Sequence, residues 1–169
     1  MLFRSHHDSE MARHDMSGMP MESAGPKFKS RDPADPYYPC SIMAAKYLEA
    51  CYGMQTSIML ELNGRDFEAT AKTCDGAPEA WRYTCYQSLG TNISGEAVGD
   101  NARAIRLCSL GTARYQPWCF LTVAKDRITQ AADPAEGFAF CREVSGEPNR
   151  MKCYQGIGQI GRASCRERV

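Results

Sequence analysis

Histidine is almost missing from this chain, because its three copies, His6, His7 and His14, all lie within the first 14 residues. From residue 15 onward there is therefore no imidazole to act as a general base, to activate a nucleophile or to bind a metal. No serine lies in the Gly-x-Ser-x-Gly context of a nucleophile elbow either. The sequence therefore predicts that this chain is not an enzyme.

An excess of positive charge and a long hydrophobic run are also lacking. The chain has 20 Lys and Arg against 20 Asp and Glu, and it has no basic stripe. The counterion release that drives binding to a phosphate backbone therefore has no source, and nucleic acid is not an expected partner. No apolar run reaches the roughly 20 residues that a membrane-spanning helix needs, so no membrane span is expected in this fragment.

Cysteine, in contrast, is plentiful and regularly spaced. Eight of the nine cysteines follow one rhythm: Cys40, Cys51, Cys74, Cys85, Cys108, Cys119, Cys141 and Cys153. The gaps between them are 11, 23, 11, 23, 11, 22 and 12 residues. This is a repeat of about 34 residues with two cysteines in each unit, and periods of that size are typical of stacked helical hairpins. The rhythm predicts an all-α solenoid of αα-hairpin repeats with one disulfide per repeat, in an oxidising compartment.

Both ends of the chain resemble a translated sequencing adapter. Residues 2–5 are what CTCTTCCGATCT encodes, and residues 160–169 match the translation of the same short-read adapter in the opposite sense. We therefore expect residues 1–5 and 160–169 to be adapter-derived, which leaves 16 basic and 19 acidic residues in the body of the chain. On this interpretation the chain is a fragment of a larger exported protein, and its signal peptide is not present in the fragment.

Residues 6–39 lack helical or strand periodicity and are rich in Met, His and Pro, which predicts a flexible arm or linker. Within it lie His14, Met16, Met19 and Met21. Thioether and imidazole groups together suit copper, because soft sulfur selects Cu(I). The segment resembles the Met/His-rich segments of exported copper-handling proteins, and the alternative is a linker that happens to be rich in methionine.

From Cys40 onward the chain divides into four units. They cover residues 40–73, 74–107, 108–140 and 141–159, and the last is incomplete. Eight residues before the first cysteine of units two, three and four there is an aspartate, at Asp66, Asp100 and Asp133. A carboxylate there can cap the first turn of a short helix that ends near the cysteine.

A glycine follows the first cysteine of the same units, at Gly76, Gly111 and Gly146. Glycine suits the left-handed conformation that ends many helices, so we expect each to be a helix C-cap. A second helix then carries the second cysteine of each unit.

Aromatic residues recur beside that second cysteine. One ring lies four residues before it, at Tyr47, Trp81 and Tyr115, and another directly after it, at Tyr52, Tyr86, Phe120 and Tyr154. Such rings could form a surface that stacks on a ligand, or they could pack between neighbouring hairpins. We favour packing, because recurrence once per unit is what a stacked core requires.

The spacing leaves the disulfide pairing open. Pairing across the short gaps joins two helices at similar distances from their turn, and the same is roughly true of a long-gap pair such as Cys51 with Cys74. Zinc is a third alternative, but structural zinc sites use cysteines two to four residues apart.

Residues 74–90, in which Cys-Tyr-Gln-Ser-Leu-Gly ends the segment, resemble the secreted cysteine-rich, Sel-type relatives of tetratricopeptide repeat proteins. The resemblance covers roughly residues 40–159, although the cysteine spacing here is wider than in that family. It implies a disulfide from the second helix of one hairpin to the first helix of the next, which is the short-gap pairing. The chain is also similar to uncharacterised exported bacterial proteins with Cys-Tyr-x-x-x-Gly repeats.

Together these expectations predict a non-enzymatic, exported, periplasmic or extracellular repeat scaffold that binds a protein or peptide. Two alternatives stay open. One is a periplasmic protein that handles copper or another metal through the Met/His arm, and the other is an accessory domain of an enzyme whose active site lies in a missing N-terminal part.

Overall fold

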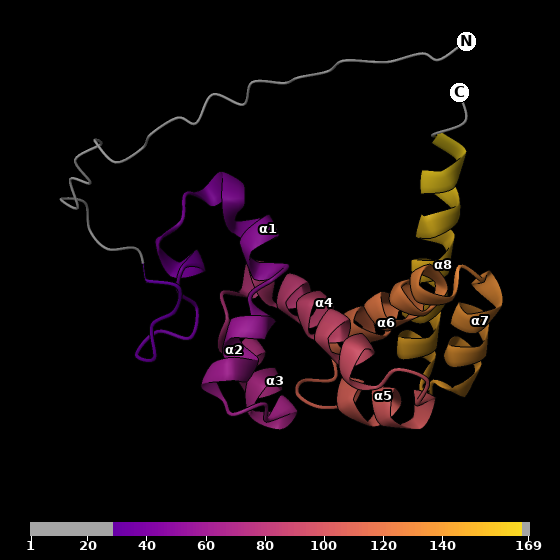
Figure 1. Cartoon of the computed structure of the whole chain (residues 1–169), viewed down its shortest axis with the longest axis horizontal. Helices are drawn as coiled ribbons and strands as arrows, with labels where there is room; N and C mark the ends of the chain where they lie inside the picture. The colour runs from indigo at the N-terminus through magenta and orange to yellow at the C-terminus, as the bar shows by residue number, and fades with distance from the viewer. Residues whose placement is uncertain (1–28, 167–169) are drawn as a thin grey trace, which may run out of the picture.

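A computed structural model describes residues 29–166 of the protein, with side chains up to residue 160. Apart from one isolated bridge between Asp32 and Asp35, every regular element in this range is helical, so the all-α class predicted from the spacing is confirmed (Figure 1). Two short 3-10 helices come first, η1 (Cys40–Ile42) and η2 (Ala45–Tyr47). The α-helices are α1 (Leu48–Tyr52), α2 (Thr56–Leu62), α3 (Phe67–Gly76), α4 (Glu79–Glu96), α5 (Asn101–Cys108), α6 (Gln116–Ala131), α7 (Pro134–Glu143) and α8 (Glu147–Arg166).

The helices pack on one another in chain order. α4 lies against α2 and α6, and α6 lies against α8. The shorter helices lie alongside, with α3 on α4, α5 on α4 and α6, and α7 on α6 and α8. The first helices and the last therefore lie at opposite ends of the described chain, as the run of colour from indigo to yellow shows in Figure 1.

Four disulfides join the cysteines across the short gaps. They are Cys40–Cys51, Cys74–Cys85, Cys108–Cys119 and Cys141–Cys153, with Cα atoms 5.5–5.7 Å apart. Three of them tie the end of a short helix to the helix that follows, α3 to α4, α5 to α6 and α7 to α8. These three are buried in the core, where they cross-link each helix pair.

The three aspartates cap their helices as predicted. The Asp66 carboxylate accepts from the backbone N–H groups of the second and third residues of α3, at 2.8 and 3.0 Å. Asp100 accepts from an N–H of α5 at 2.8 Å, and Asp133 accepts from one of α7 at 2.8 Å. Each carboxylate satisfies a donor that the helix itself cannot pair.

The glycines behave differently from the prediction. Gly76 is the last residue of α3 and is not left-handed, and a Cβ atom on it would lie 2.6 Å from the Tyr37 hydroxyl. Its small size therefore admits a close neighbour. Gly111 and Gly146 are left-handed, with φ of 74° and 81°, but each lies three residues beyond its helix, in the connection to the next one.

The last residues before Cys40 pack on the helices. The Tyr37 hydroxyl donates to the backbone carbonyl of Thr73 at 2.9 Å. The Gln55 amide donates to the carbonyl oxygens of Pro36 and Tyr38, at 3.0 and 2.8 Å. Residues 36–38 are therefore part of the packed body, although residues 6–39 were expected to form a flexible arm.

The first unit lacks the continuous long helix of the others. Residues 53–55 form a turn between α1 and α2, in which the Met54 N–H bonds to the Cys51 carbonyl, one residue closer than in an α-helix. Gly53 is a poor helix former, which favours a change of winding at this point. The Met54 side chain projects outward from the turn, and 76% of it is exposed.

The core is built from the inner faces of α4 and α6 together with the disulfides. Tyr86, Leu89 and Ile93 of α4 and Phe120 and Val123 of α6 are fully buried. None of the helices in residues 29–166 is long and apolar enough to cross a membrane.

Candidate functional site

Aromatic rings link each unit to the next. Tyr52, directly after the second cysteine of unit one, stacks on Trp81 of unit two, with centroids 6.2 Å apart and planes at 6°. Tyr86, at the same position of unit two, meets Tyr115 of unit three at 5.8 Å. The rings thus pack between neighbouring units, which is the interpretation that the sequence favoured.

The Trp81 contact belongs to a helix face that receives the preceding unit. Counted from the second cysteine, this face has positions −4, −1, +3 and +7, and we call it the upstream face. In unit two it consists of Trp81, Thr84, Ser88 and Asn92. The hydroxyls of Ser88 and Thr56 are 2.6 Å apart, and the Asn92 amide donates to Thr56 Oγ1 at 2.9 Å. Unit one therefore covers the upstream face of unit two.

The upstream face of unit three is covered in the same way. Trp118, at position −1, meets the ring of Tyr83 with centroids 5.1 Å apart. Thr122, at position +3, lies against Gly90, where an added Cβ atom would be 2.9 Å from the Thr122 Cβ. Two successive units thus present the same positions to the unit before them.

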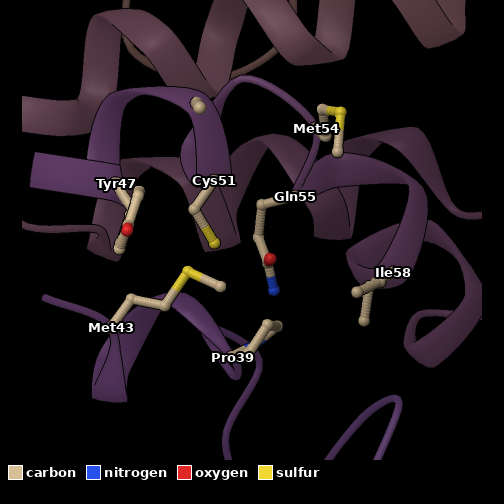
Figure 2. Close-up of a pocket in the computed structure, with 8 residues that line it drawn as sticks. Pro39, Met43, Tyr47, Cys51, Met54, Gln55 and Ile58 are labelled. Atoms are coloured by element: carbon tan, nitrogen blue, oxygen red, sulfur yellow. The ribbon is translucent and has the colours of Figure 1, made fainter.

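In unit one the upstream face is open and forms a pocket. Its residues, Tyr47, Ala50, Met54 and Ile58, all line an apolar space of ≈ 470 Å³. Pro39, Met43, Cys51 and Gln55 complete the lining. Figure 2 shows Met43, Cys51 and Gln55 extending into the space between Tyr47 and Ile58. The volume falls within the range of about 300–1,000 Å³ that is typical of ligand pockets.

The pocket offers almost no chemistry beyond apolar contact. Gln55 is its one amide, and its N–H groups are already donated to two backbone carbonyls. Tyr47 was expected to pack between hairpins, but 54% of it is exposed, because no unit precedes it within the described residues. The arrangement can hold a hydrophobic or aromatic group, and the two thioethers of Met43 and Met54 can adapt to its shape.

Exposed apolar side chains concentrate at the two ends of the described chain. At the first unit they are Ile42, Met43, Tyr47 and Met54, and at the other end they are Phe138 on α7 and Met151 on α8. Val98 is the exception, in the connection between α4 and α5. Such clustering marks interaction surfaces, whereas single exposed apolar residues are ordinary.

A second pocket of ≈ 280 Å³ lies beside Arg127 on α6. Arg127 is only 6% exposed, and its guanidinium donates to the Ala97 carbonyl at the C-terminal end of α4. A cation there offsets the negative end of the α4 dipole. Arg127 thus has a structural role, and Glu136 in the same lining gives this pocket a mixed charge.

The predicted copper ligands, His14, Met16, Met19 and Met21, lie outside the described residues. Within residues 29–166 no group of three or more His, Cys, Asp or Glu side chains is placed to hold a metal ion. The eight regularly spaced cysteines form disulfides, so they offer no thiolate.

Comparison of the chain with protein-family models, with curated proteins and with solved structures finds no match in any of the three.

Sequence reasoning missed the pocket, although a signal for it exists. Tyr47, Ala50, Met54 and Ile58 recur at the helical spacing of four, three and four residues, and all are apolar. As one member of the ring series, Tyr47 was expected only to pack between hairpins. Met43 could not have been found this way, because it lies in the turn between η1 and η2.

Proposed function

We propose that the chain is a non-enzymatic, exported helical-repeat scaffold that binds a helix of a protein partner through the upstream face of unit one. The four units form a solenoid, each with one disulfide. Support for the solenoid comes from the contacts that recur between successive units, Tyr52 with Trp81 and Tyr86 with Tyr115.

The observation that carries the binding role is the open apolar face itself. Here the outer surface of unit one presents Tyr47 and Met54, which are 54% and 76% exposed, over a pocket with an apolar lining. Surface of this kind is costly to leave in water and is typical of a binding site.

The kind of occupant follows from the equivalent faces. In units two and three the corresponding positions receive a ring from a neighbouring helix, Tyr52 on Trp81 and Tyr86 on Tyr115. A helix that presents an aromatic or large aliphatic side chain is therefore the ligand that fits. Recognition of this kind uses apolar anchors at helical spacing on the partner.

Export is part of the proposal because of the disulfides. Four bridges within residues 40–153 are expected where thiols are oxidised and are rare in a reducing cytosol. A non-enzymatic role is proposed because residues 15–169 contain no histidine and the regularly spaced cysteines are bridged.

Nuclear magnetic resonance of methionine methyl groups tests the proposal. The probes are stapled helical peptides that carry Tyr, Leu or Ser at one central position. We expect the Tyr and Leu peptides to shift the methyl signals of Met43 and Met54 and the Ser peptide to shift neither. Met59, which is fully buried, and Met151, at the other end, serve as internal controls.

The matched variants are Met54→Gln, which makes the face polar, and Val98→Gln, which makes the same kind of change at an exposed site away from it. Binding lost in the first and kept in the second supports the proposed site. Absence of any shift with the Tyr and Leu peptides at millimolar concentration contradicts it.

A further inference from the structure

Arg127 is a buried cation without an anionic partner. Only 6% of it is exposed, and none of the ion pairs among the described residues includes it. Asp126 is next to it on α6, but adjacent side chains on a helix do not face each other. Of the guanidinium nitrogens, only Nη2 has a partner in the described part of the chain, the Ala97 carbonyl. Nε is sealed from solvent, whereas Nη1 is not.

The end of α4 offsets only part of the Arg127 charge. The carbonyl end of a helix carries roughly half a negative elementary charge, whereas a guanidinium group stays fully charged in proteins. Burying a charge that is not paired is costly. About half of the positive charge of Arg127 is therefore left for an anion to neutralise.

The second pocket, of ≈ 280 Å³, gives an anion access to Arg127. It lies where the connection between α4 and α5 meets the last turns of α6 and the first turn of α7. Its lining comes from units two and three, so it is not formed by either end of the described chain. The volume is just below the range of about 300–1,000 Å³ typical of pockets for drug-sized ligands, so a smaller molecule is the occupant that fits.

The other polar groups of the lining are mainly acceptors. The Gln130 amide nitrogen donates to the Ser94 hydroxyl at 3.3 Å, and that of Asn101 donates to the Glu143 carboxylate at 2.9 Å. The side-chain carbonyl oxygen of each amide is then the end left to accept. Glu136 is exposed, and its carboxylate forms no ion pair with any described residue. One cation and several oxygen acceptors therefore line the same small space.

We infer that this pocket binds a small zwitterion whose carboxylate and ammonium groups are close together, as in a free α-amino acid. The carboxylate pairs with Arg127 through Nη1, and the ammonium group donates to Glu136 and to the oxygen of Gln130 or Asn101. Val98, which is 68% exposed in the same lining, offers apolar contact to the side chain of the ligand. This site is separate from the upstream face of unit one and goes beyond the proposed function.

A plain anion fits the pocket less well than a zwitterion does. Arg127 is the one cation of the lining, and a second negative charge on the ligand, as on inorganic phosphate, would face the Glu136 carboxylate. A plain cation would be repelled by Arg127. Only a ligand that carries both charges satisfies both side chains.

Nuclear magnetic resonance of the arginine Nε–H groups in the oxidised full chain tests the inference, with L-alanine as the probe at pH 6.5. We expect the Arg127 signal to shift and to saturate with a dissociation constant on the order of 1 mM, as for a ligand of few non-hydrogen atoms. The Arg82 signal is the internal control, because its Nε–H donates to the Ala77 carbonyl at the other end of α4. An Arg127 signal that does not respond to alanine up to about 20 mM overturns the inference.

Three further probes separate the two charges. N-acetyl-L-alanine keeps the carboxylate alone, L-alaninamide keeps the ammonium group alone, and inorganic phosphate is a plain anion. Each should bind at least about tenfold more weakly than alanine, because each loses a charge-assisted hydrogen bond. Equal binding of phosphate or of N-acetyl-L-alanine overturns the zwitterion and indicates a plain anion site.

Glu136→Gln removes the partner of the ammonium group and leaves Arg127 in place, since loss of Arg127 would also uncap α4. We expect it to weaken alanine binding at least about tenfold and to leave binding of N-acetyl-L-alanine unchanged or tighter. Glu147→Gln is the matched control, because Glu147 is also an exposed glutamate in a first helical turn but lies outside the pocket. Equal alanine binding by the two variants overturns the role of Glu136.

The result is separable from that of the peptide experiment. Alanine should leave the methyl signals of Met43 and Met54 unshifted, because both line the other pocket. Arg127 shifts without any peptide binding would support the zwitterion site and contradict the proposed helix site, and the reverse result would do the opposite.

Discussion

Gly90 of α4 lies against the backbone of Cys119 in α6, so that a Cβ atom at position 90 would stand 2.7 Å from the Cys119 carbonyl oxygen. That oxygen belongs to a helix and cannot move aside as a flexible side chain can. We therefore expect Gly90→Ala to lower the free energy of unfolding by about 1–3 kcal/mol, the usual effect of overpacking. The alanine gains about 1 kcal/mol of helix propensity, which the clash outweighs.

Urea denaturation measures this change, and Gly95→Ala is the control. Gly95 lies on the same helix, and an added Cβ atom there meets nothing within 4 Å. Alanine at 95 should raise the stability by up to about 1 kcal/mol. If both variants were equally stable, close approach of α4 and α6 would not be the reason for glycine at position 90.

The Tyr86 hydroxyl is a buried hydrogen-bonding centre. It donates to the Asp75 carboxylate at 2.7 Å and accepts from the Thr112 N–H at 2.9 Å. Burial, and then the bond to Asp75, raise the pKa of Tyr86 far above its ordinary value, so the hydroxyl stays protonated and able to donate even at a pH at which an exposed tyrosine ionises. Tyr86→Phe should lower the free energy of unfolding by about 1.5–3 kcal/mol, the range for a bond to a charged group.

Tyr83→Phe is the comparison for that variant in urea denaturation. The Tyr83 ring keeps its contact with Trp118 when the hydroxyl is removed, so a change within about 0.5 kcal/mol is expected. A loss as large as that of Tyr86→Phe would mean that the hydrogen bond to Asp75 is not the cause.

The Cys74–Cys85 bridge is expected to contribute mainly by restricting the unfolded chain. Its two cysteines are separated by 11 residues, and closing a loop of this size is worth roughly 3 kcal/mol in the chain-entropy model. The double change Cys74→Ala with Cys85→Ala should lower stability by about that amount, measured by urea denaturation without reductant. In the presence of reductant the variant and the unmodified chain should differ much less, and a difference that stays the same would contradict the expected role.

Asp126 gives the chain a specific dependence on pH. Burial raises the pKa of this carboxyl above its ordinary value of 3.8, against the opposing effect of Lys125 and Arg127. The folded state therefore binds the proton more tightly than the unfolded state does, and the Asp126 contribution to stability falls as pH rises from 3.8 through the raised pKa. Asp126→Asn should stabilise the protein at pH 7, and this gain should disappear near pH 3.

Thermal unfolding at the two pH values checks the Asp126 prediction. Glu49→Gln, which removes an exposed carboxylate from α1, is the control for a general change in net charge. Equal gains in both variants, or a gain for Asp126→Asn that persists at pH 3, would count against the buried carboxyl.

Much of the fold could be predicted from local chemistry. The positions at which three helices begin could be predicted from Asp66, Asp100 and Asp133. The free N–H groups of a first helical turn need an acceptor, and that need is the same in every fold. The glycines were harder, because a glycine can serve a left-handed turn or a close approach. Only the position of Tyr37 shows that Gly76 serves the second purpose.

The site was less predictable than the fold. The face at Tyr47 and Ile58 follows from helical spacing, but whether a neighbour covers it depends on tertiary packing. Met43 and Pro39 reach the pocket through the 3-10 turns before α1, which periodicity does not indicate. The clue that the sequence offers to the pocket is Tyr47 itself. It is the first ring of its series, whereas its equivalents Trp81 and Tyr115 each contact a ring of the preceding unit.

The short disulfide loops have a consequence for how the protein matures. The separations are 11, 11, 11 and 12 residues, and no bridge encloses another. On the proposed export route the chain enters an oxidising compartment from its N-terminus, so Cys51 is the first cysteine to follow Cys40, and Cys85 is the first to follow Cys74. The order of arrival and the connectivity of the four bridges therefore coincide, so on that route the second cysteine of each unit can pair with the cysteine before it without reshuffling.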